Sequence, residues 1–191
     1  METMWHYGSF FMLVFLLLFT ACGQQPVPKP RGYLRIDFPA KAYRASDDSV
    51  PFLFMMPTYG TLEAGQAPYA YNLVFPQYKA TLYLTYYDRP GTLGSLMEAS
   101  RQMVYQHTIR ADAIKETMYQ DSVHRVWAMV YDLQGDVASA VQFYATDSAA
   151  YFLRGALYFY CEPNADSLAP AVSFFREDIV KLLETLRWPR S

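Results

Sequence analysis

Apolar and aromatic residues form two runs of strand length between Asp136 and Cys161, separated by the turn residues Thr146-Asp147-Ser148. Such a pattern predicts a β-hairpin. In the second run, successive side chains alternate between one face, with Tyr151, Leu153, Gly155, Leu157, Phe159 and Cys161, and the other, with Phe152, Arg154, Ala156, Tyr158 and Tyr160. Because both faces are mostly apolar, this strand is expected near the middle of a sheet with layers on both sides. The small residues Ala138, Ala140, Gly155 and Ala156 are expected to let a helix approach closely.

Further strands follow from the same period of two. Tyr69–Phe75 and Lys79–Tyr87 form a second predicted hairpin across Pro76-Gln77-Tyr78, and Val50–Met56 is a short apolar run. Ile114–Tyr119 and Val123–Leu133 precede the first hairpin through short, turn-like connections. These two strands and that hairpin predict a four-stranded antiparallel meander.

Two stretches have the period of an amphipathic helix. Ser95-Leu96-Met97-Glu98 has the spacing of a capping box, and the predicted helix runs to about Ile109 with Leu96, Ala99, Met103 and His107 on its apolar side. The second helix begins after a predicted N-cap at Ser167. Its apolar stripe is Leu168, Val172, Phe175, Ile179, Leu182, Leu183 and Leu186. The predicted fold is therefore α+β, an antiparallel sheet of two hairpins and a four-stranded meander region, flanked by helices.

The start of the chain has the features of a bacterial lipoprotein leader. Phe10–Phe19 is a ten-residue apolar run, too short for a bilayer span but of the size of a signal-peptide core. Thr20-Ala21-Cys22 follows and resembles a lipobox, in which the cysteine becomes the acylated first residue. We therefore expect a signal peptide at 1–21, a Pro-rich lipidated tether at 22–30 and a single α+β domain at 31–191.

Composition and motifs favour a protein without an active site. The 191 residues carry a formal net charge of -2, and no basic patch typical of nucleic-acid binding is present. Common catalytic, nucleotide and metal motifs do not occur, and His107 and His124 have no partner at ligand spacing. We expect a protein that is not an enzyme, with no catalytic residues, no bound metal and no cofactor. Cys161 is interpreted as a small core residue.

Three arginines remain as candidate partner-binding residues. Arg31 and Arg35 lie in a predicted edge strand between prolines, where they are either solvated or dock a partner. Arg154 lies in the middle of an otherwise apolar strand, and a buried charge is costly unless it is paired. It either spreads over Tyr158 and bonds a carboxylate or a helix end, or lines a cleft that binds an anion or a partner's carboxylate. We expect the first of these roles for Arg154.

Several longer segments resemble one known family, and they span nearly the whole chain after Cys22. They are Pro28–Pro39, Ala80–Leu84, Gly135–Ser139, Phe152–Phe159 and Phe174–Ile179. Together with the lipobox, they resemble the gliding-motility-associated lipoprotein GldD family of Bacteroidetes. The resemblance implies an outer-membrane-associated lipoprotein needed for the gliding machinery, which is coupled to type IX secretion. The lipobox predicts acylation of Cys22, with palmitate among the expected chains, and the lack of an acidic run after Cys22 favours the periplasmic side. It implies no catalytic activity. A cysteine that the family would place in Thr58–Pro68, to pair with Cys161, is absent here.

The resemblance and the residues together give two expected functions. The first is a non-enzymatic, lipid-anchored accessory protein that contacts other gliding and secretion proteins in the cell envelope. The second is a periplasmic lipoprotein that binds a small ligand or a glycan through a Tyr-rich sheet face and Arg154. The order of strands and helices also looks like the PsbP/Mog1 type of sandwich, an analogy of fold that says little about function.

Overall fold

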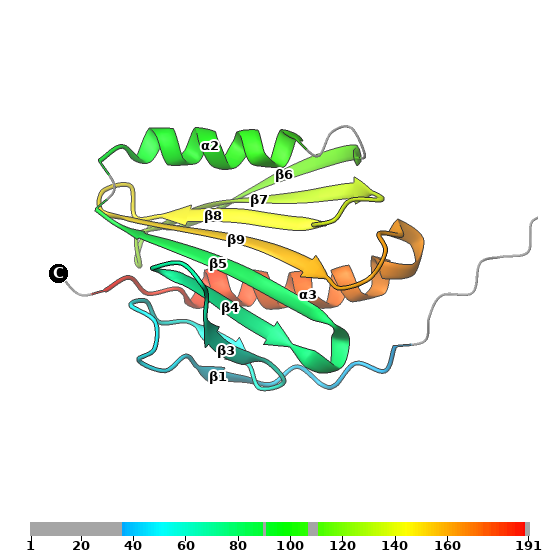
Figure 1. Ribbon diagram of the computed structural model, residues 1–191. Coiled ribbons are helices and arrows are strands. Elements are labelled where there is room, and N and C mark those ends of the chain that lie inside the picture. The colour runs from blue at the N-terminus through cyan, green and yellow to red at the C-terminus, as the bar shows by residue number, and fades with distance from the viewer. Residues whose placement is uncertain (1–35, 90, 107–110, 190–191) are drawn as a thin grey trace, which may run out of the picture. The chain divides into compact units, whose positions relative to one another are not determined.

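The computed structural model describes residues 36–89, 91–106 and 111–189, all of which belong to one compact unit, Tyr33–Ser191 (Figure 1). The α+β class is confirmed. The elements are β1 (Tyr43–Ala45), β2 (Met55–Pro57), β3 (Thr61–Ala64), β4 (Ala70–Phe75), the 3-10 turn η1 (Pro76–Tyr78), β5 (Ala80–Asp88), α2 (Leu93–Tyr105), β6 (Ala111–Asp121), β7 (Val126–Gly135), β8 (Val141–Thr146), β9 (Tyr151–Phe159) and α3 (Ala165–Thr185). The leader and the tether fall outside the described residues.

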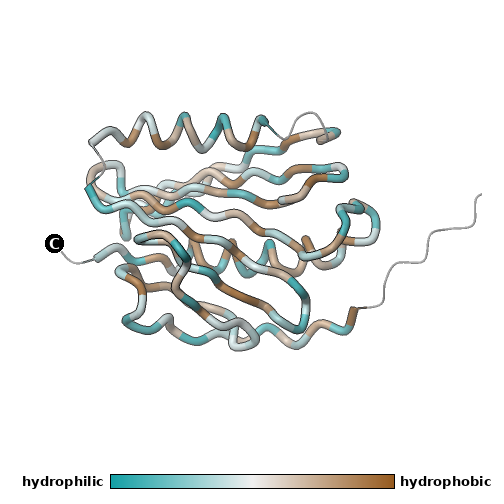
Figure 2. The backbone as a smooth tube through the Cα atoms, in the orientation of Figure 1, coloured by the Kyte–Doolittle hydropathy of each residue, from teal (hydrophilic) through white to brown (hydrophobic). Residues whose placement is uncertain are grey.

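Seven strands form one antiparallel sheet in the order β3-β4-β5-β9-β8-β7-β6. Both predicted hairpins and the meander of β6 to β9 are confirmed. Strand β9 lies between β5 and β8, at the centre of the sheet as its two apolar faces predict. The sheet lies between α2 and α3, and Figure 2 shows hydrophobic residues along its central strands and along α3.

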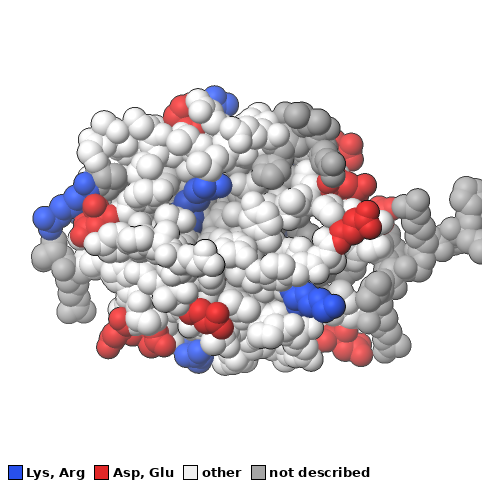
Figure 3. Space-filling view, in the orientation of Figure 1, with Lys and Arg blue, Asp and Glu red and all other residues white. Residues whose placement is uncertain are grey.

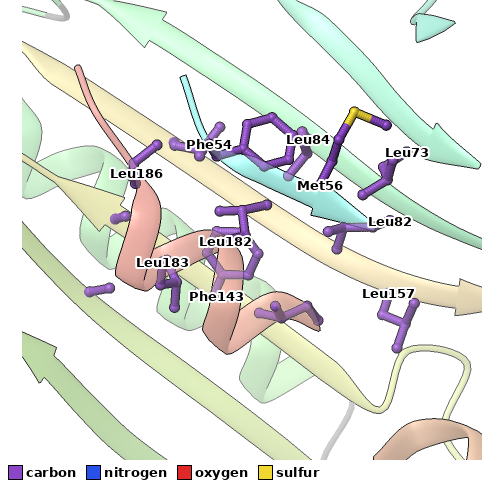
Figure 4. Close-up of a cluster of buried hydrophobic side chains, with 14 of the residues drawn as sticks. Phe54, Met56, Leu73, Leu82, Leu84, Phe143, Leu157, Leu182, Leu183 and Leu186 are labelled. Atoms are coloured by element: carbon purple, nitrogen blue, oxygen red, sulfur yellow. The ribbon is translucent and has the colours of Figure 1, made fainter. Parts of the chain in front are cut away.

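The main core lies between the sheet and α3. The predicted stripe of α3 supplies Phe175, Ile179, Leu182, Leu183 and Leu186, all buried. They pack with the inward side chains of the central strands and with Phe52, Phe54 and Met56 of the segment before β3 (Figure 4). The predicted strand Val50–Met56 is wrong in extent, because a strand forms only at Met55–Pro57, which pairs with β1. Before it, Leu53 makes an isolated bridge to Arg187, while Phe52 and Phe54 bury their side chains.

The helix ends differ from the predictions. α3 begins at Ala165, and its N-cap is Asn164, whose side chain accepts from the Ser167 amide. Ser167 is therefore not the cap. α2 begins at Leu93 after Thr92, with no side-chain capping bond, so the predicted capping box does not form. Glu98 instead bonds Arg101 at 2.9 Å, because exposed side chains one turn apart reach each other.

α2 also turns a different face to the sheet. Its buried residues are Ser100 and Val104, whereas Met103 of the predicted stripe is 41% exposed. Val104 joins a second, smaller cluster on this side of the sheet, with Tyr131, Leu133 and Val137. The helix ends by Tyr105, and His107 lies outside the described residues.

Gly155 makes room for a neighbouring strand and not for a helix. It pairs with Phe143 of β8, and a Cβ built on it would lie 2.2 Å from the Phe143 ring. A glycine in a strand often marks such a close approach. The ring of Phe143 thus occupies the space beside Gly155 that a helix was expected to fill.

Candidate functional site

The side of the sheet that faces α2 is only partly covered by that helix. α2 contacts β8 and β9, while β5, on the other side of β9, leaves large side chains in solvent. Tyr83 and Tyr87 are each 38% exposed, and Tyr160, just beyond β9, is 60% exposed. We name this surface the tyrosine face and define it as Tyr83, Tyr87, Arg154, Tyr158 and Tyr160.

The strand register brings these side chains together. Tyr83 pairs with Ala156 and Tyr87 pairs with Phe152, so the rings of β5 stand beside those of β9. The Tyr83 and Tyr158 rings meet edge to face with centroids 5.6 Å apart. The Tyr83 and Tyr160 hydroxyls are hydrogen-bonded to each other. The tyrosines are therefore held by their neighbours, and rigid aromatic side chains of this kind are common in protein contact surfaces.

Arg154 is the only charged residue of the tyrosine face. It pairs with Thr85 of β5 and Tyr144 of β8, and its side chain is half-buried. Burial lowers the pKa of its guanidinium from the ordinary value, and the nearby Tyr158 and Tyr87 side chains oppose this shift. Among the described residues, its guanidinium has no hydrogen-bond or ion-pair partner. The expected internal partner of Arg154 is thus not found, because the strands beside it carry Tyr and Thr instead of Asp or Glu.

The surface around the tyrosine face is poor in charge. Figure 3 shows basic atoms near the middle of the view surrounded by uncharged residues, while acidic groups lie mainly toward the margins. Desolvating an uncharged surface costs less than desolvating a charged one.

A groove of about 860 Å³ at one end of the sheet gathers several basic residues, which include Arg125, Arg187 and His124. Each has an internal partner: Arg125 lies 3.5 Å from Asp147, His124 lies 2.6 Å from Asp121, and Arg187 donates to the Leu186 carbonyl at 2.7 Å. These polar groups therefore already have hydrogen-bond or ion-pair partners within the fold. His124 lies in the turn between β6 and β7, so its predicted place on a strand is wrong.

An ionic cluster around Asp178 of α3 was not predicted from the sequence. The Asp178 carboxylate of α3 is buried and accepts from Lys41 Nζ at 2.7 Å, Tyr43 at 2.9 Å and Tyr59 at 2.6 Å. Lys41 also donates to the Phe174 carbonyl at 2.6 Å. One signal was available, since Asp178 falls within the apolar stripe of the last helix. The cluster fixes the start of the domain to α3, and its groups satisfy one another.

The other candidate residues have these places. Cys22, Arg31 and Arg35 lie outside the described residues. Cys161 is a free, exposed thiol beyond the end of β9, so its predicted burial is wrong because the strand ends at Phe159. The described part of the chain holds no group of three or more His, Cys, Asp or Glu able to hold a metal ion. Across those same residues, no helix is long and apolar enough to cross a membrane.

Comparisons with known proteins give a likeness to solved structures and a family. The solution structure of cyanobacterial PsbP (CyanoP) from Synechocystis sp. PCC 6803 is similar over 80% of this chain and 97% of that chain, with 12% sequence identity and a TM-score of 0.45. A sequence search of the curated proteins gives no match. The family model described as gliding motility lipoprotein GldD matches residues 23–188. Because this match covers well over half of the sequence, the chain belongs to the gliding motility lipoprotein GldD family.

Proposed function

We propose that this protein is a non-enzymatic accessory lipoprotein of the gliding motility and type IX secretion machinery, which acts through protein-protein contacts in the cell envelope. Membership in the family gives a gliding motility lipoprotein that is associated with the envelope. The observation that carries the contact role is the tyrosine face, an open, aromatic and charge-poor part of the central sheet. Exposed aromatic patches of this kind are typical of interaction sites.

The proposed anchor is a lipid on Cys22, with the domain in the periplasm at the outer membrane. Palmitate would be one of the acyl chains, and the segment from Cys22 to Arg35 would reach at most about 45 Å when fully extended. Such a tether keeps the domain near the membrane while it leaves the tyrosine face free to meet a membrane-bound partner.

A second candidate function is a periplasmic lipoprotein that binds a small ligand or a glycan. The same rings favour it, since aromatic faces and an arginine can also bind a sugar acid. The two functions differ in what remains attached to the protein after purification, and this difference can be measured.

The test is affinity purification of the full chain from gently crosslinked cells of a gliding strain. We expect gliding and secretion proteins to be enriched with the wild-type protein and lost when Tyr83→Ser and Tyr87→Ser are combined. The matched control is Tyr105→Ser on α2, outside the tyrosine face and also 39% exposed. Recovery of a bound small molecule or glycan with no enriched protein would support the second function and contradict the first.

The anchor has its own test. Cys22→Ser should abolish incorporation of radiolabelled palmitate and leave the precursor uncleaved, because the acceptor thiol for acylation is gone. Cys161→Ser is the matched control and should be labelled like the wild-type protein. Equal labelling of wild type and Cys22→Ser would remove the lipid anchor from the proposal.

A further inference from the structure

We infer that Arg154 binds a carboxylate of a partner polypeptide, which docks on the tyrosine face. The inference rests on the proposed function, because it specifies the chemistry of the protein contact proposed there.

The Arg154 charge is partly buried and has no acidic partner among the described residues. Its guanidinium is partly removed from water by the rings around it, and the described residues supply no acceptor to compensate. Arginine stays charged in proteins, so this cost persists in the folded chain. The residues outside the description contain a single acidic side chain, Glu2, at the far end of the leader. A compensating acid is therefore expected from another molecule.

The second step is the kind of anion. A guanidinium presents a planar pair of donors that matches the two oxygens of a carboxylate. Phosphate sites usually gather several cations or backbone amides, whereas no other Lys or Arg of the described residues acts on Arg154. A single arginine among tyrosines therefore fits one carboxylate better than the phosphate of a lipid headgroup.

The third step is the carrier of that carboxylate. The exposed rings of Tyr83 and Tyr87 flank the arginine and offer apolar surface on the β5 side. Tyrosine and arginine are the residues that most often dominate protein interfaces. An Asp, a Glu or a chain end between apolar side chains would meet both features at once. A polypeptide is thus favoured over a glycan, which would use the rings but is often neutral.

The experiment places the photocrosslinker p-benzoylphenylalanine at Tyr87 of the full chain in gliding cells. Tyr87 is exposed, and its ring contacts Phe152, which is two residues from Arg154 on the same face. Crosslinked partners are identified by mass spectrometry, and the yield is compared among wild type, Arg154→Lys, Arg154→Gln and the control Arg44→Gln. Arg44 is an exposed arginine of β1, in the separate two-stranded sheet.

We expect Arg154→Gln to lower the crosslink yield about tenfold or more, since a hydrogen-bonded charge pair is lost. Arg154→Lys should keep part of the yield, and Arg44→Gln should keep all of it. The crosslinked peptide should contain Asp, Glu or a C-terminus, and replacing that acid by its amide should cause the same loss. This last variant leaves Arg154 intact, so the result does not depend on the folding of an Arg154 variant.

An equal yield from wild type and Arg154→Gln would overturn the inference. The absence of any crosslink, or a crosslink to a glycan or a phospholipid, would overturn it too. The same experiment distinguishes failure of this inference from failure of the proposed function. An Arg154-dependent partner that has no part in gliding or secretion would contradict the function and support the inference, whereas an Arg154-independent gliding partner would do the reverse.

Discussion

Asp178 and Arg154 show two different settings for a charge that is partly or fully removed from water. Asp178 is buried and has donors from Lys41, Tyr43 and Tyr59, so its charge is compensated within the domain. Arg154 is half-buried, and no group of the described residues compensates it. A charge that is removed from water destabilises the fold unless an opposite charge or hydrogen-bond partners compensate it. Asp178 therefore stabilises the fold, whereas Arg154 is inferred to bind a carboxylate of another molecule.

Tyr86 gives a prediction at the scale of one atom. Its ring is buried against Phe52, and its hydroxyl has no hydrogen-bond partner within the described part of the chain. Removing a buried, unsatisfied hydroxyl removes its desolvation cost, so Tyr86→Phe should raise the free energy of unfolding by about 1 kcal/mol. Urea unfolding of the purified protein measures this change. Tyr59→Phe is the matched control and should lower stability, because the Tyr59 hydroxyl bonds Asp178; a less stable Tyr86→Phe would contradict the packing described here.

The sequence could locate these residues but could not assign their partners. Arg154 stood out because it interrupts an apolar strand, yet whether an acid lies opposite depends on which strand pairs with it. Asp178 was overlooked because the stripe around it was interpreted as wholly apolar. Cys161 was assigned to the core because alternation was extended two residues past the end of β9. Contacts between distant segments decide all three cases.

At the scale of elements, the period of the apolar residues predicted most of the structure. The stripe of α3 and the alternation in β5 and β9 both match the buried residues. The α2 face was wrong, because Ser100 is small enough to lie against the sheet although it is polar. The structure of the N-terminal segment could not be predicted from its own pattern, because Lys41 and Tyr43 hold it to α3, far along the chain.

This anchoring gives a prediction for the N-terminal segment. Asp178→Ala removes the acceptor of Lys41, Tyr43 and Tyr59 and should cost about 3 kcal/mol, as expected when one partner of a buried ion pair is lost. Residues 36–45 should then become sensitive to limited proteolysis before the rest of the domain. Lys181→Ala on the same helix is the control, because its side chain is 39% exposed and its ammonium lies 3.9 Å from Glu184. Its contact with the Tyr43 ring, 5.9 Å from the centroid, is at the outer limit of a cation–π interaction. Its cost should be less than about 0.5 kcal/mol, and similar cleavage of both variants would show that Asp178 does not fix the segment.

At the scale of the whole molecule, the meander could be predicted and the pairing of β5 with β9 could not. Short turns join β6 to β9 in sequence, so their neighbours follow from chain order. β5 and β9 are separated by α2 and three strands, and period-two patterns do not choose partners at that distance. This pairing is also what creates the tyrosine face, which explains why the sequence suggested a Tyr-rich face but not its members.

Four tyrosines that are fully or partly buried predict how the whole domain responds to alkali. Burial raises the pKa of Tyr43, Tyr59, Tyr86 and Tyr131 above the ordinary value of 10.0, and hydrogen bonds to Asp178 raise it further for Tyr43 and Tyr59. The unfolded chain loses these protons near pH 10 while the folded chain keeps them, so stability is full below that pH and falls as the pH rises. Absorbance at the tyrosinate band should show these side chains ionising only on unfolding. Their complete ionisation near pH 10 with the fold intact would contradict their burial.

The central claim, that Arg154 serves a contact outside the fold, is tested most directly by the melting temperature of the full-length Arg154→Gln protein. A charge without an internal partner contributes little to the fold, so the melting temperature should stay within about 2 °C of the wild-type value or rise above it. A fall of about 6 °C or more would correspond to the loss of a buried, paired arginine. That result would contradict the claim and show that Arg154 holds the sheet together.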